Sequence, residues 1–255
     1  MDSLFHILII SAVQGVTEFI PVSSSAHLNL FTNFYGLQDQ ELILNVSAHF
    51  GSLIAVILFF KKEILNFSKN KKLFLKIIVA SIPLFFFGYT IIEFKLISDL
   101  RSLEVIGWMT LIFGILLYLS DKFKLRLKME EHFTFKNALI IGLFQALAIV
   151  PGVSRSGIII TAARLLKFKR QDAAKISFLM SIPALAGVSI FGFNSLINEA
   201  NILLNLQSIL TFIFSLIFSY LTIKYFLIYL KKFDFSLIIA YRIILGIFIL
   251  TFAYL

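Results

Sequence analysis

Long apolar stretches separated by short polar segments dominate the chain. Eight windows are predominantly apolar, at roughly 4–20, 42–60, 73–92, 103–120, 136–150, 173–193, 208–230 and 236–255. A helix needs about 20 such residues to cross the hydrocarbon core of a bilayer. Two further apolar pieces, at about 22–35 and 153–166, are too short and too polar to cross alone. The pattern predicts an all-α integral membrane protein.

Lysine and arginine gather in four of the segments between these windows. Six lysines lie in 61–76, five basic residues in 121–136, five in 164–175 and two in 231–232, whereas 194–207 has none. Cytoplasmic loops of membrane proteins carry the excess of Lys and Arg. We therefore predict that the four basic segments lie on the cytoplasmic side.

The window 136–150 lies between two of these basic segments, although a single crossing cannot begin and end on the same side. We therefore predict that the chain turns back at Pro151 and Gly152, with 153–166 as the return arm. Such a re-entrant hairpin is tolerated only where protein or a water-filled cavity satisfies the freed backbone groups.

The same reasoning predicts a second hairpin near the N-terminus. Window 42–60 must run from outside to inside to reach the basic segment that follows it. The arms 4–20 and 22–35, joined at Pro21, then form a hairpin that enters from the outside. The first 60 residues contain no Lys or Arg, which agrees with an outside location for the ends of this hairpin. The same lack of basic residues argues against a cleaved signal peptide.

Together these observations predict six transmembrane helices plus two re-entrant helical hairpins, arranged as an inverted-topology repeat. A single membrane domain would cover 1–255, with repeats at about 1–120 and 133–255 and with both termini outside. The alternative is eight simple spans with one misplaced basic loop.

Composition narrows the class further. The chain is 59% hydrophobic, with a mean hydropathy of +0.95, which is more apolar surface than a soluble domain can bury. The net charge of +9 is carried by short clusters beside apolar windows. Such clusters are typical of orientation signals and anionic lipid, so we predict no nucleic-acid partner. Thirty Phe against one Trp indicate lipid-facing bulk, and the lack of cysteine excludes disulfides.

Two polar stretches within the predicted hairpins are similar to each other. The first begins at Gln14 and reads QGVTEFIPVSSSAH, and the second begins at Gln145 and reads QALAIVPGVSRSG. Each runs from a Gln to a Pro, a Val and a serine cluster. The first contributes Glu18 and His27, and the second contributes Arg155. Broken half-helices of this kind meet near the bilayer midplane and bind anions in known membrane folds.

Glu18 needs a partner because a charged side chain at the bilayer centre costs about 2.5–3.5 kcal/mol. Gln14 lies four residues earlier, on the same face of a helix. A carboxylate beside an amide carbonyl suits a hard divalent cation, Mg²⁺ or Ca²⁺. A simple Gln–Glu hydrogen bond that joins helices is the alternative.

The serine clusters predict an anion site. Pro21 favours a helix start, so the backbone N–H groups that follow it would be free and would face the cavity with the positive end of the helix dipole behind them. The second copy repeats this pattern with a glycine that lets the backbone approach a ligand. Ordinary N-capping by serine explains only part of the cluster. The candidate substrate-binding residues are Ser23, Ser25, Ser154, Ser156 and Gly157.

Ser24 and His27 lie three residues apart, on one face of a predicted helix. A serine with a histidine within reach is the smallest nucleophile–base pair. A structural histidine is the alternative interpretation. His49 is a weaker candidate, which we expect to form hydrogen bonds within the bundle.

Arg155 is the most informative residue because its planar guanidinium suits bidentate contact with phosphate. An ion pair with Glu18 is the alternative, and that pair would also bring the two motifs together. Arg242 is a weaker candidate that we expect to snorkel or to bind a lipid head group. The residues thus indicate a membrane-embedded site, open to the outside, that hydrolyses a phosphorylated lipid by positioning and charge neutralisation.

The two motifs resemble the signature motifs of the undecaprenyl-diphosphatase family, the bacitracin-resistance type of membrane phosphatase. QGVTEFIPVSSSAH is similar to the acidic box that runs into a Pro-x-Ser-Ser-x-x-His element, and PGVSRSG is similar to the arginine box. The similarity extends through SFLMSIPALAG to the AYR near the C-terminus. The resemblance implies hydrolysis of a C55 isoprenoid diphosphate at the outer face of the bacterial cytoplasmic membrane, with a divalent cation.

The resemblance also implies roles for single residues. Glu18 and Gln14 fall on the acidic box, Ser24 on a candidate nucleophile, His27 on the catalytic histidine and Arg155 on the phosphate-binding arginine. Many members have Glu where this chain has Gln14, which weakens the metal role of that position. The resemblance leaves open whether a phosphoserine forms, or whether His27 acts directly or through water.

A transporter or flippase of an anionic polyprenyl lipid is the alternative function, since inverted repeats with half-helices also occur in transporters. Lipid phosphatases of the phosphatidic-acid type are rejected, because the His expected six residues after the Arg is Thr161 here. The predicted partners are the polyprenyl diphosphate and the bilayer. The sequence leaves a homodimer open.

Overall fold

The computed structural model describes residues 2–35, 41–94, 99–123, 127–198 and 206–255. Over these residues the chain is almost entirely helical, and the only β contact is an isolated bridge between Leu127 and Phe168. The all-α prediction is confirmed. The α-helices, in order, are α1 (Asp2–Thr17), α2 (Ser24–Tyr35), α3 (Glu41–Phe59), α4 (Lys61–Leu65), α5 (Phe67–Glu93), α6 (Leu103–Asp121), α7 (Met129–His132), α8 (Phe135–Ala146), α9 (Arg155–Leu165), α10 (Arg170–Asn198), α11 (Leu206–Lys232) and α12 (Ser236–Tyr254). Two 3₁₀ turns, η1 (Asp99–Arg101) and η2 (Leu147–Ile149), complete the described elements.

Five described helices are long and apolar enough to cross a membrane, and they match five of the six predicted spans. They are Lys69–Glu93, Leu103–Asp121, Arg170–Gly192, Leu206–Lys232 and Ser236–Tyr254. The window predicted at 42–60 forms the shorter apolar helix Ile43–Phe59, so the sixth span stays a prediction. Parts of the predicted connecting segments 36–41, 121–136 and 194–207 lie outside the described residues.

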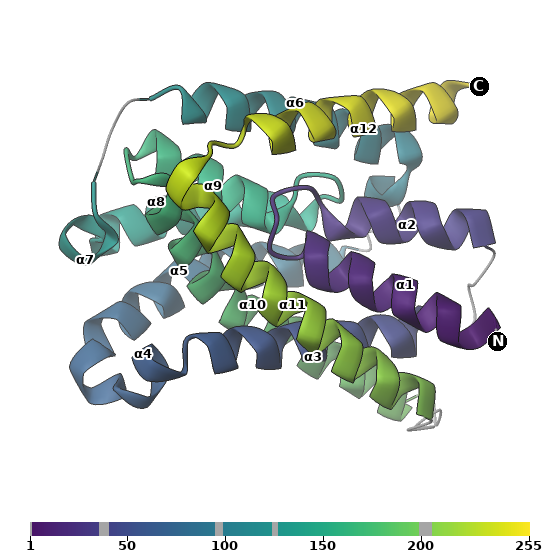
Figure 1. Cartoon of the computed structure of the whole chain (residues 1–255), viewed down its shortest axis with the longest axis horizontal. Helices are drawn as coiled ribbons and strands as arrows, with labels where there is room; N and C mark the ends of the chain where they lie inside the picture. Colours follow the sequence, from purple (N-terminus) through teal and green to yellow (C-terminus); the bar gives the residue numbers. More distant parts are fainter. Residues whose placement is uncertain (1, 36–40, 95–98, 124–126, 199–205) are drawn as a thin grey trace.

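Two helix–turn–helix pairs reach into the molecule from opposite ends. In Figure 1, α1 and α2 extend toward the end that carries both termini, whereas α8 and α9 extend toward the end that carries α7. The members of each pair pack against each other. Their turns meet, since the Ser156 hydroxyl donates to the Ile20 carbonyl at 3.1 Å. The predicted breaks therefore fall where they were expected, and the two motifs face each other.

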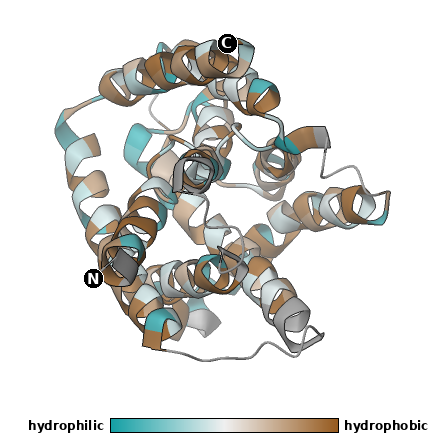
Figure 2. Ribbon diagram, turned by 90° about the vertical axis from the view of Figure 1, so that its right-hand side faces the viewer, coloured by the Kyte–Doolittle hydropathy of each residue, from teal (hydrophilic) through white to brown (hydrophobic). Residues whose placement is uncertain are grey.

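The helices that surround these pairs present apolar side chains outward. Figure 2 looks nearly along most helix axes and shows apolar residues over much of the outer faces. Phe86 of α5 is 65% exposed and Ile244 of α12 is 67% exposed. Exposed apolar area on this scale is expected of a surface solvated by lipid and not by water. The interpretation of many Phe side chains as lipid-facing bulk agrees with it.

α9 is the buried centre of the fold. Every residue from Ser156 to Arg164 is buried, and the helix packs against α6, α8 and α10. It is too short and too polar to span a membrane alone, and burial within protein satisfies its polar groups. The second motif opens α9, so the fold holds that motif on a fixed support.

Small residues let α3 and α11 pack closely against each other. A Cβ added at Gly51 would lie 2.5 Å from the Phe212 carbonyl oxygen, so only glycine fits there. The Ser52 hydroxyl contacts the hydroxyls of Ser215 at 3.2 Å and Ser219 at 2.9 Å. Small residues and interhelical hydroxyl bonds drive helix association where water is absent.

Candidate functional site

The two motif turns have the same local conformation. Ser23 precedes α2 with a φ of 78°, and Ser154 precedes α9 with a φ of 69°. Each hydroxyl accepts a hydrogen bond from the backbone N–H three residues later, Ala26 at 3.4 Å and Gly157 at 3.1 Å. Left-handed backbone is strained for serine and persists only where the surroundings fix it. The duplication seen in the sequence is therefore also a duplication of structure.

The helices begin slightly later than predicted. α2 begins at Ser24, so Pro21 lies in the turn and not in the first helical turn. The first turns of α2 and α9 nevertheless both start at the site, each with backbone N–H groups that have no partner within their helix. The remaining serines flank them, with Ser23 and Ser25 hydroxyls 3.2 Å apart and Ser154 and Ser156 hydroxyls 3.3 Å apart.

Glu18 is the centre of the polar network. Its Oε1 accepts from Arg155 Nη2 at 2.7 Å. Its Oε2 accepts from Gln14 Nε2 at 2.8 Å and from the Ser24 hydroxyl at 2.9 Å. The carboxylate and guanidinium side chains are only 7% and 14% exposed. A buried charge pair needs such additional hydrogen bonds to offset its desolvation. The Gln14–Glu18 hydrogen bond and the Glu18–Arg155 ion pair, which the sequence offered as alternatives, are both present.

Arg155 uses only part of its donor capacity. Its Nε and Nη1 are buried and have no hydrogen-bond partner within the described part of the chain. Native proteins rarely leave buried donors unpaired, so such atoms point to a missing ligand. A guanidinium with one nitrogen on Glu18 and two nitrogens unbonded can bind a phosphate group without leaving the carboxylate.

A cavity of about 570 Å³ opens beside this network. Ser24 and Ser25 line it from the first turn, and Ala148, Ile149 and Pro151 line it from the second. The rest of the wall comes from α2, α3, α10 and the segment before α6, namely Leu28, Asn29, Asn45, Val46, His49, Leu100, Arg101, Val188, Phe191 and Gly192. Its walls are mainly apolar with a few polar groups, which suits an amphiphilic ligand.

His27 is not bonded to Ser24 in this structure. Its Nδ1 donates to the Ser23 carbonyl at 2.7 Å, and its Nε2 accepts from the Tyr241 hydroxyl at 2.6 Å. The Ser24 hydroxyl instead donates to Glu18. The proposed Ser24–His27 pair therefore stays a prediction, and Glu18 is the base that already contacts the Ser24 proton.

His49 was a weak candidate from the sequence, yet it faces the site. It lines the cavity from α3 and lies close enough to Glu18 for a direct electrostatic interaction. Its Nδ1 also bonds the Asn45 carbonyl at 2.7 Å, as expected for a histidine within the bundle. No motif surrounds His49, so only the packing of α3 could reveal this position.

The expectation that Arg242 snorkels or binds a lipid head group is wrong. The side chain is fully buried at 0% exposure, and its nitrogens donate to backbone carbonyls of both motif turns. The acceptors are Pro21 at 3.2 Å and Gly152 and Val153 at 3.1 Å each, with Thr110 of α6 at 3.3 and 3.4 Å. Arg242 therefore joins the two turns and satisfies carbonyl groups that a broken helix leaves free.

A divalent cation fits the residues in one respect. Gln14 Oε1 is buried without a partner among the described residues, and it belongs to the side chain that already contacts Glu18. An amide oxygen beside a carboxylate is a ligand pair for Mg²⁺ or Ca²⁺. Over the same residues there is no group of three or more His, Cys, Asp and Glu that could hold a metal. A cation here would need further oxygens from a bound phosphate.

Comparison with known proteins gives close matches along the whole chain. The family model described as bacitracin resistance protein BacA matches residues 7–248. An undecaprenyl-diphosphatase of Pelagibacter ubique (strain HTCC1062) is 44% identical over 254 residues, which is 99% of each chain. Proteins with the same name from Saccharophagus degradans and Jannaschia sp. are 42% and 36% identical, and they cover 96% and 99% of each chain respectively.

Proposed function

Because the chain belongs to the family described as bacitracin resistance protein BacA, we propose that it is a membrane phosphatase that hydrolyses undecaprenyl diphosphate. The products are undecaprenyl phosphate and inorganic phosphate. Its full-length relatives carry the name undecaprenyl-diphosphatase. The reaction returns the lipid carrier to cell-wall synthesis and confers resistance to bacitracin.

The contact that joins Arg155, Glu18 and Ser24 carries this proposal. One turn supplies a hydroxyl and a carboxylate, and the other supplies a guanidinium with two unbonded nitrogens. Arg155 would bind the terminal phosphate through one fork of its guanidinium, in which Nε or Nη1 acts together with the second hydrogen of Nη2. The first turns of α2 and α9 would direct backbone N–H groups at the same phosphate, with Ser25, Ser156 and Gly157 beside them.

Ser24 is the proposed nucleophile. Its oxygen would attack the terminal phosphorus while its proton passes to Glu18 Oε2, the atom that it contacts at 2.9 Å. The bond from that phosphorus to the bridging oxygen would break, and undecaprenyl phosphate would leave. Water would then hydrolyse the phosphoserine to release inorganic phosphate. Stabilisation of the developing charge by Arg155 and by the helix N-termini would supply most of the rate enhancement.

The proposed cofactor is Mg²⁺ or Ca²⁺, with Glu18 and Gln14 Oε1 as its protein ligands. When bound, the cation would neutralise charge on the diphosphate. A single carboxylate and one amide oxygen are few protein ligands for a divalent cation. Mg²⁺ commonly takes its remaining ligands from substrate phosphates and water. Cation and lipid would then bind together.

We propose that six spans and two re-entrant hairpins place the site at the outer face of the bacterial cytoplasmic membrane, with both termini outside. The basic segments support this orientation. They adjoin α4, α7 and the α11–α12 turn, at the end opposite to the termini in Figure 1. The diphosphate would enter between the turns, and the isoprenoid tail would lie along the apolar walls of the cavity.

A phosphate-release assay on the purified full-length protein tests the proposal. Undecaprenyl diphosphate is the substrate, and Ser24→Ala is compared with Ser81→Ala. Ser81 is a suitable control because its hydroxyl donates to the Ile77 carbonyl of its own helix at 2.9 Å and does not line the cavity beside Ser24. We expect phosphate release by the wild type and the control and none above background by Ser24→Ala. Movement of the lipid across vesicles without phosphate release would favour a flippase and contradict the proposal.

A further inference from the structure

A second cavity, of about 650 Å³, lies at the other end of the molecule. Helix α6 separates the two cavities. Leu100 and Arg101, just before α6, line the first, and Tyr118 and Asp121, in its last turn, line the second. A helix of 19 residues is about 28 Å long at 1.5 Å per residue. The second cavity is therefore distinct from the phosphatase site.

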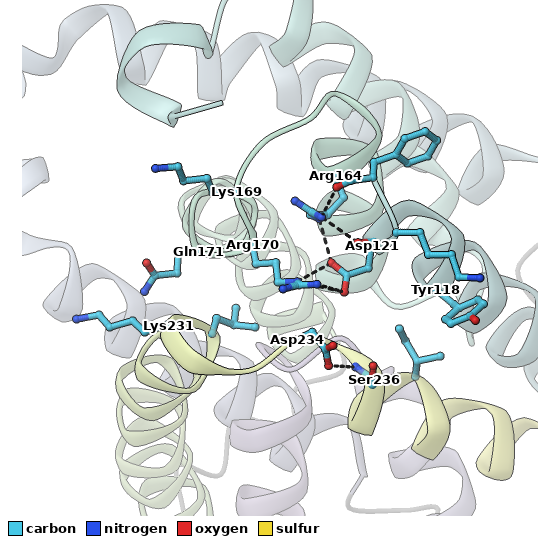
Figure 3. A pocket seen from close by; sticks show the side chains of 13 residues that line it. Tyr118, Asp121, Arg164, Lys169, Arg170, Gln171, Lys231, Asp234 and Ser236 are labelled. Carbon is cyan, nitrogen blue, oxygen red and sulfur yellow. Dashed lines mark hydrogen bonds and ion pairs between the residues drawn. The ribbon is translucent and has the colours of Figure 1, made fainter. Parts of the chain in front are cut away.

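The ends of five helices build this second cavity. Its walls come from the C-terminal ends of α6, α9 and α11 and from the N-terminal ends of α10 and α12, as Figure 3 shows. Two of its charged lining residues are acidic, Asp121 and Asp234, and five are basic, namely Lys122, Arg164, Lys169, Arg170 and Lys231. The cavity thus carries a net positive charge in a concave space, which concentrates anions.

The floor of the cavity is a preorganised pair of guanidinium groups. Asp121 accepts from Arg164 Nε at 3.1 Å, and from Arg170 through both carboxylate oxygens at 2.8 to 3.1 Å. Arg164 also donates to the Phe168 carbonyl at 2.6 Å and is almost fully buried. One carboxylate therefore orients two arginines, and Asp234 also interacts electrostatically with Arg170, so the excess positive charge of the cavity comes from its three lysines. The Arg170 side chain remains 36% exposed and can contact a ligand.

The other charges leave the balance positive. Asp234 accepts from the Ser236 backbone N–H at 3.0 Å, and this hydrogen bond lowers the pKa of Asp234, so it is ionised and turned toward its own helix start. Lys169 and Lys231 are exposed at the rim, where Figure 3 shows them on the side away from Tyr118. Lys122 lies 4.2 Å from the centre of the Tyr118 ring. Among the residues described, none of these three lysines forms a salt bridge with a carboxylate, and Lys169 has a longer-range electrostatic interaction with Asp172.

We propose that this cavity binds a phosphate-bearing anion. A guanidinium fork with nearby ammonium groups is the donor set that binds phosphate best. Basic pockets between transmembrane helices on the cytoplasmic side bind anionic lipid head groups. Tyr118 and Phe123 are 43% and 47% exposed beside the opening, so an acyl chain has apolar surface to contact. The phosphate can belong to such a head group or to a soluble phosphate compound. The two arms of the test below distinguish these two sources.

The test compares three forms of the full-length protein in nanodiscs of neutral phosphatidylcholine. They are the wild type, the pocket pair Lys169→Gln with Lys231→Gln, and the control pair Lys71→Gln with Lys72→Gln. Lys71 and Lys72 are exposed on α5 and do not line the cavity. Both pairs remove two positive charges, and both keep the phosphatase site, so any phosphate bound there contributes equally.

One arm raises the fraction of phosphatidylglycerol in the nanodiscs. The other arm adds inorganic phosphate and compares it with chloride added at the same ionic strength. Ligand affinity is measured by thermal unfolding and by native mass spectrometry. The pocket pair should weaken binding by roughly 10- to 30-fold, because Lys169 and Lys231 line the cavity, and the control pair by much less, because Lys71 and Lys72 can contribute only through the general charge of the surface.

An effect of the pocket pair in the lipid arm identifies a head group, and an effect in the phosphate arm alone identifies a soluble phosphate compound. Equal weakening by the pocket and control pairs, or no binding of either probe, would overturn the proposal. Unfolding without ligand checks that the lysine changes leave the fold intact. Phosphate release from undecaprenyl diphosphate by the pocket pair is measured separately. A negative result for anion binding in the second cavity therefore does not affect the phosphatase assignment, and the reverse also holds.

Discussion

Arg155 donates through Nη2 to Oε1 of Glu18 at 2.7 Å, although the two residues belong to turns that enter from opposite ends of the molecule. Each is buried, and each is the charged member of its motif. A single ion pair therefore joins the two copies of the duplicated segment. It also places the only carboxylate of the network beside the group best suited to hold a phosphate.

Replacement of Arg155 tests its unbonded donors. We expect Arg155→Lys to lower kcat/KM for phosphate release by about 10²- to 10³-fold, because a lysine retains the charge near Glu18 but loses the planar fork. Steady-state kinetics on purified protein check this, with the melting temperature as a fold control. Near-wild-type turnover by Arg155→Lys would show that bidentate binding is unnecessary.

Replacement of His27 tests which base accepts the serine proton. Since His27 bonds Ser23 and Tyr241 and not Ser24, we expect His27→Ala to lower kcat less than Ser24→Ala does. Tyr241→Phe, which removes only the hydroxyl at Nε2, should have a smaller effect still. Loss of activity in His27→Ala as complete as in Ser24→Ala, in a protein that melts normally, would instead support the Ser24–His27 pair.

Removal of Arg242 should weaken the fold more than a surface charge does. Arg242→Met leaves the carbonyls of Pro21, Gly152 and Val153 without their donor, and a buried polar group left unsatisfied costs about 1–3 kcal/mol. We expect a lower melting temperature and a lower yield of folded protein. Lys128→Met is the control, since its exposed pair with Glu131 contributes about 0–1 kcal/mol. Equal melting of the two variants would exclude a joining role for Arg242.

Removal of divalent cations tests the proposed cofactor. We expect EDTA to abolish phosphate release and Mg²⁺ or Ca²⁺ to restore it. Gln14→Glu should raise the affinity for the activating cation, because a second carboxylate strengthens an oxygen site. Activity that is indifferent to EDTA would rule out the cation, while leaving the roles of Ser24 and Arg155 open to their own tests.

Much of the fold follows from the sequence because lipid imposes strict requirements. Windows of sufficient length and the positions of basic residues predicted six spans, of which five are long apolar helices in the structure. The turn at Pro151 was predicted because basic segments on the same side flank the window 136–150. The meeting of Glu18 with Arg155 was also predictable, since a buried charge needs a partner of opposite sign and the sequence offers few.

The remaining features depend on backbone groups that no motif displays. The left-handed conformation of Ser23 and Ser154 has no signal in residue type, since serine does not favour it. Arg242 binds carbonyl oxygens of distant segments, and every residue carries a carbonyl. The orientation of His27 toward Tyr241 and of His49 toward the cavity depends on how α2, α3 and α12 pack, which periodicity does not specify.

A double-mutant cycle on kcat/KM for phosphate release from undecaprenyl diphosphate tests most directly whether the two turns form one catalytic unit. The cycle uses Glu18→Gln, Arg155→Lys and the two changes combined, with folding verified for each. We predict strong non-additivity, so that the double variant is about as impaired as the worse single variant. Free-energy losses that simply add would mean that Glu18 and Arg155 act independently, and would contradict a shared site.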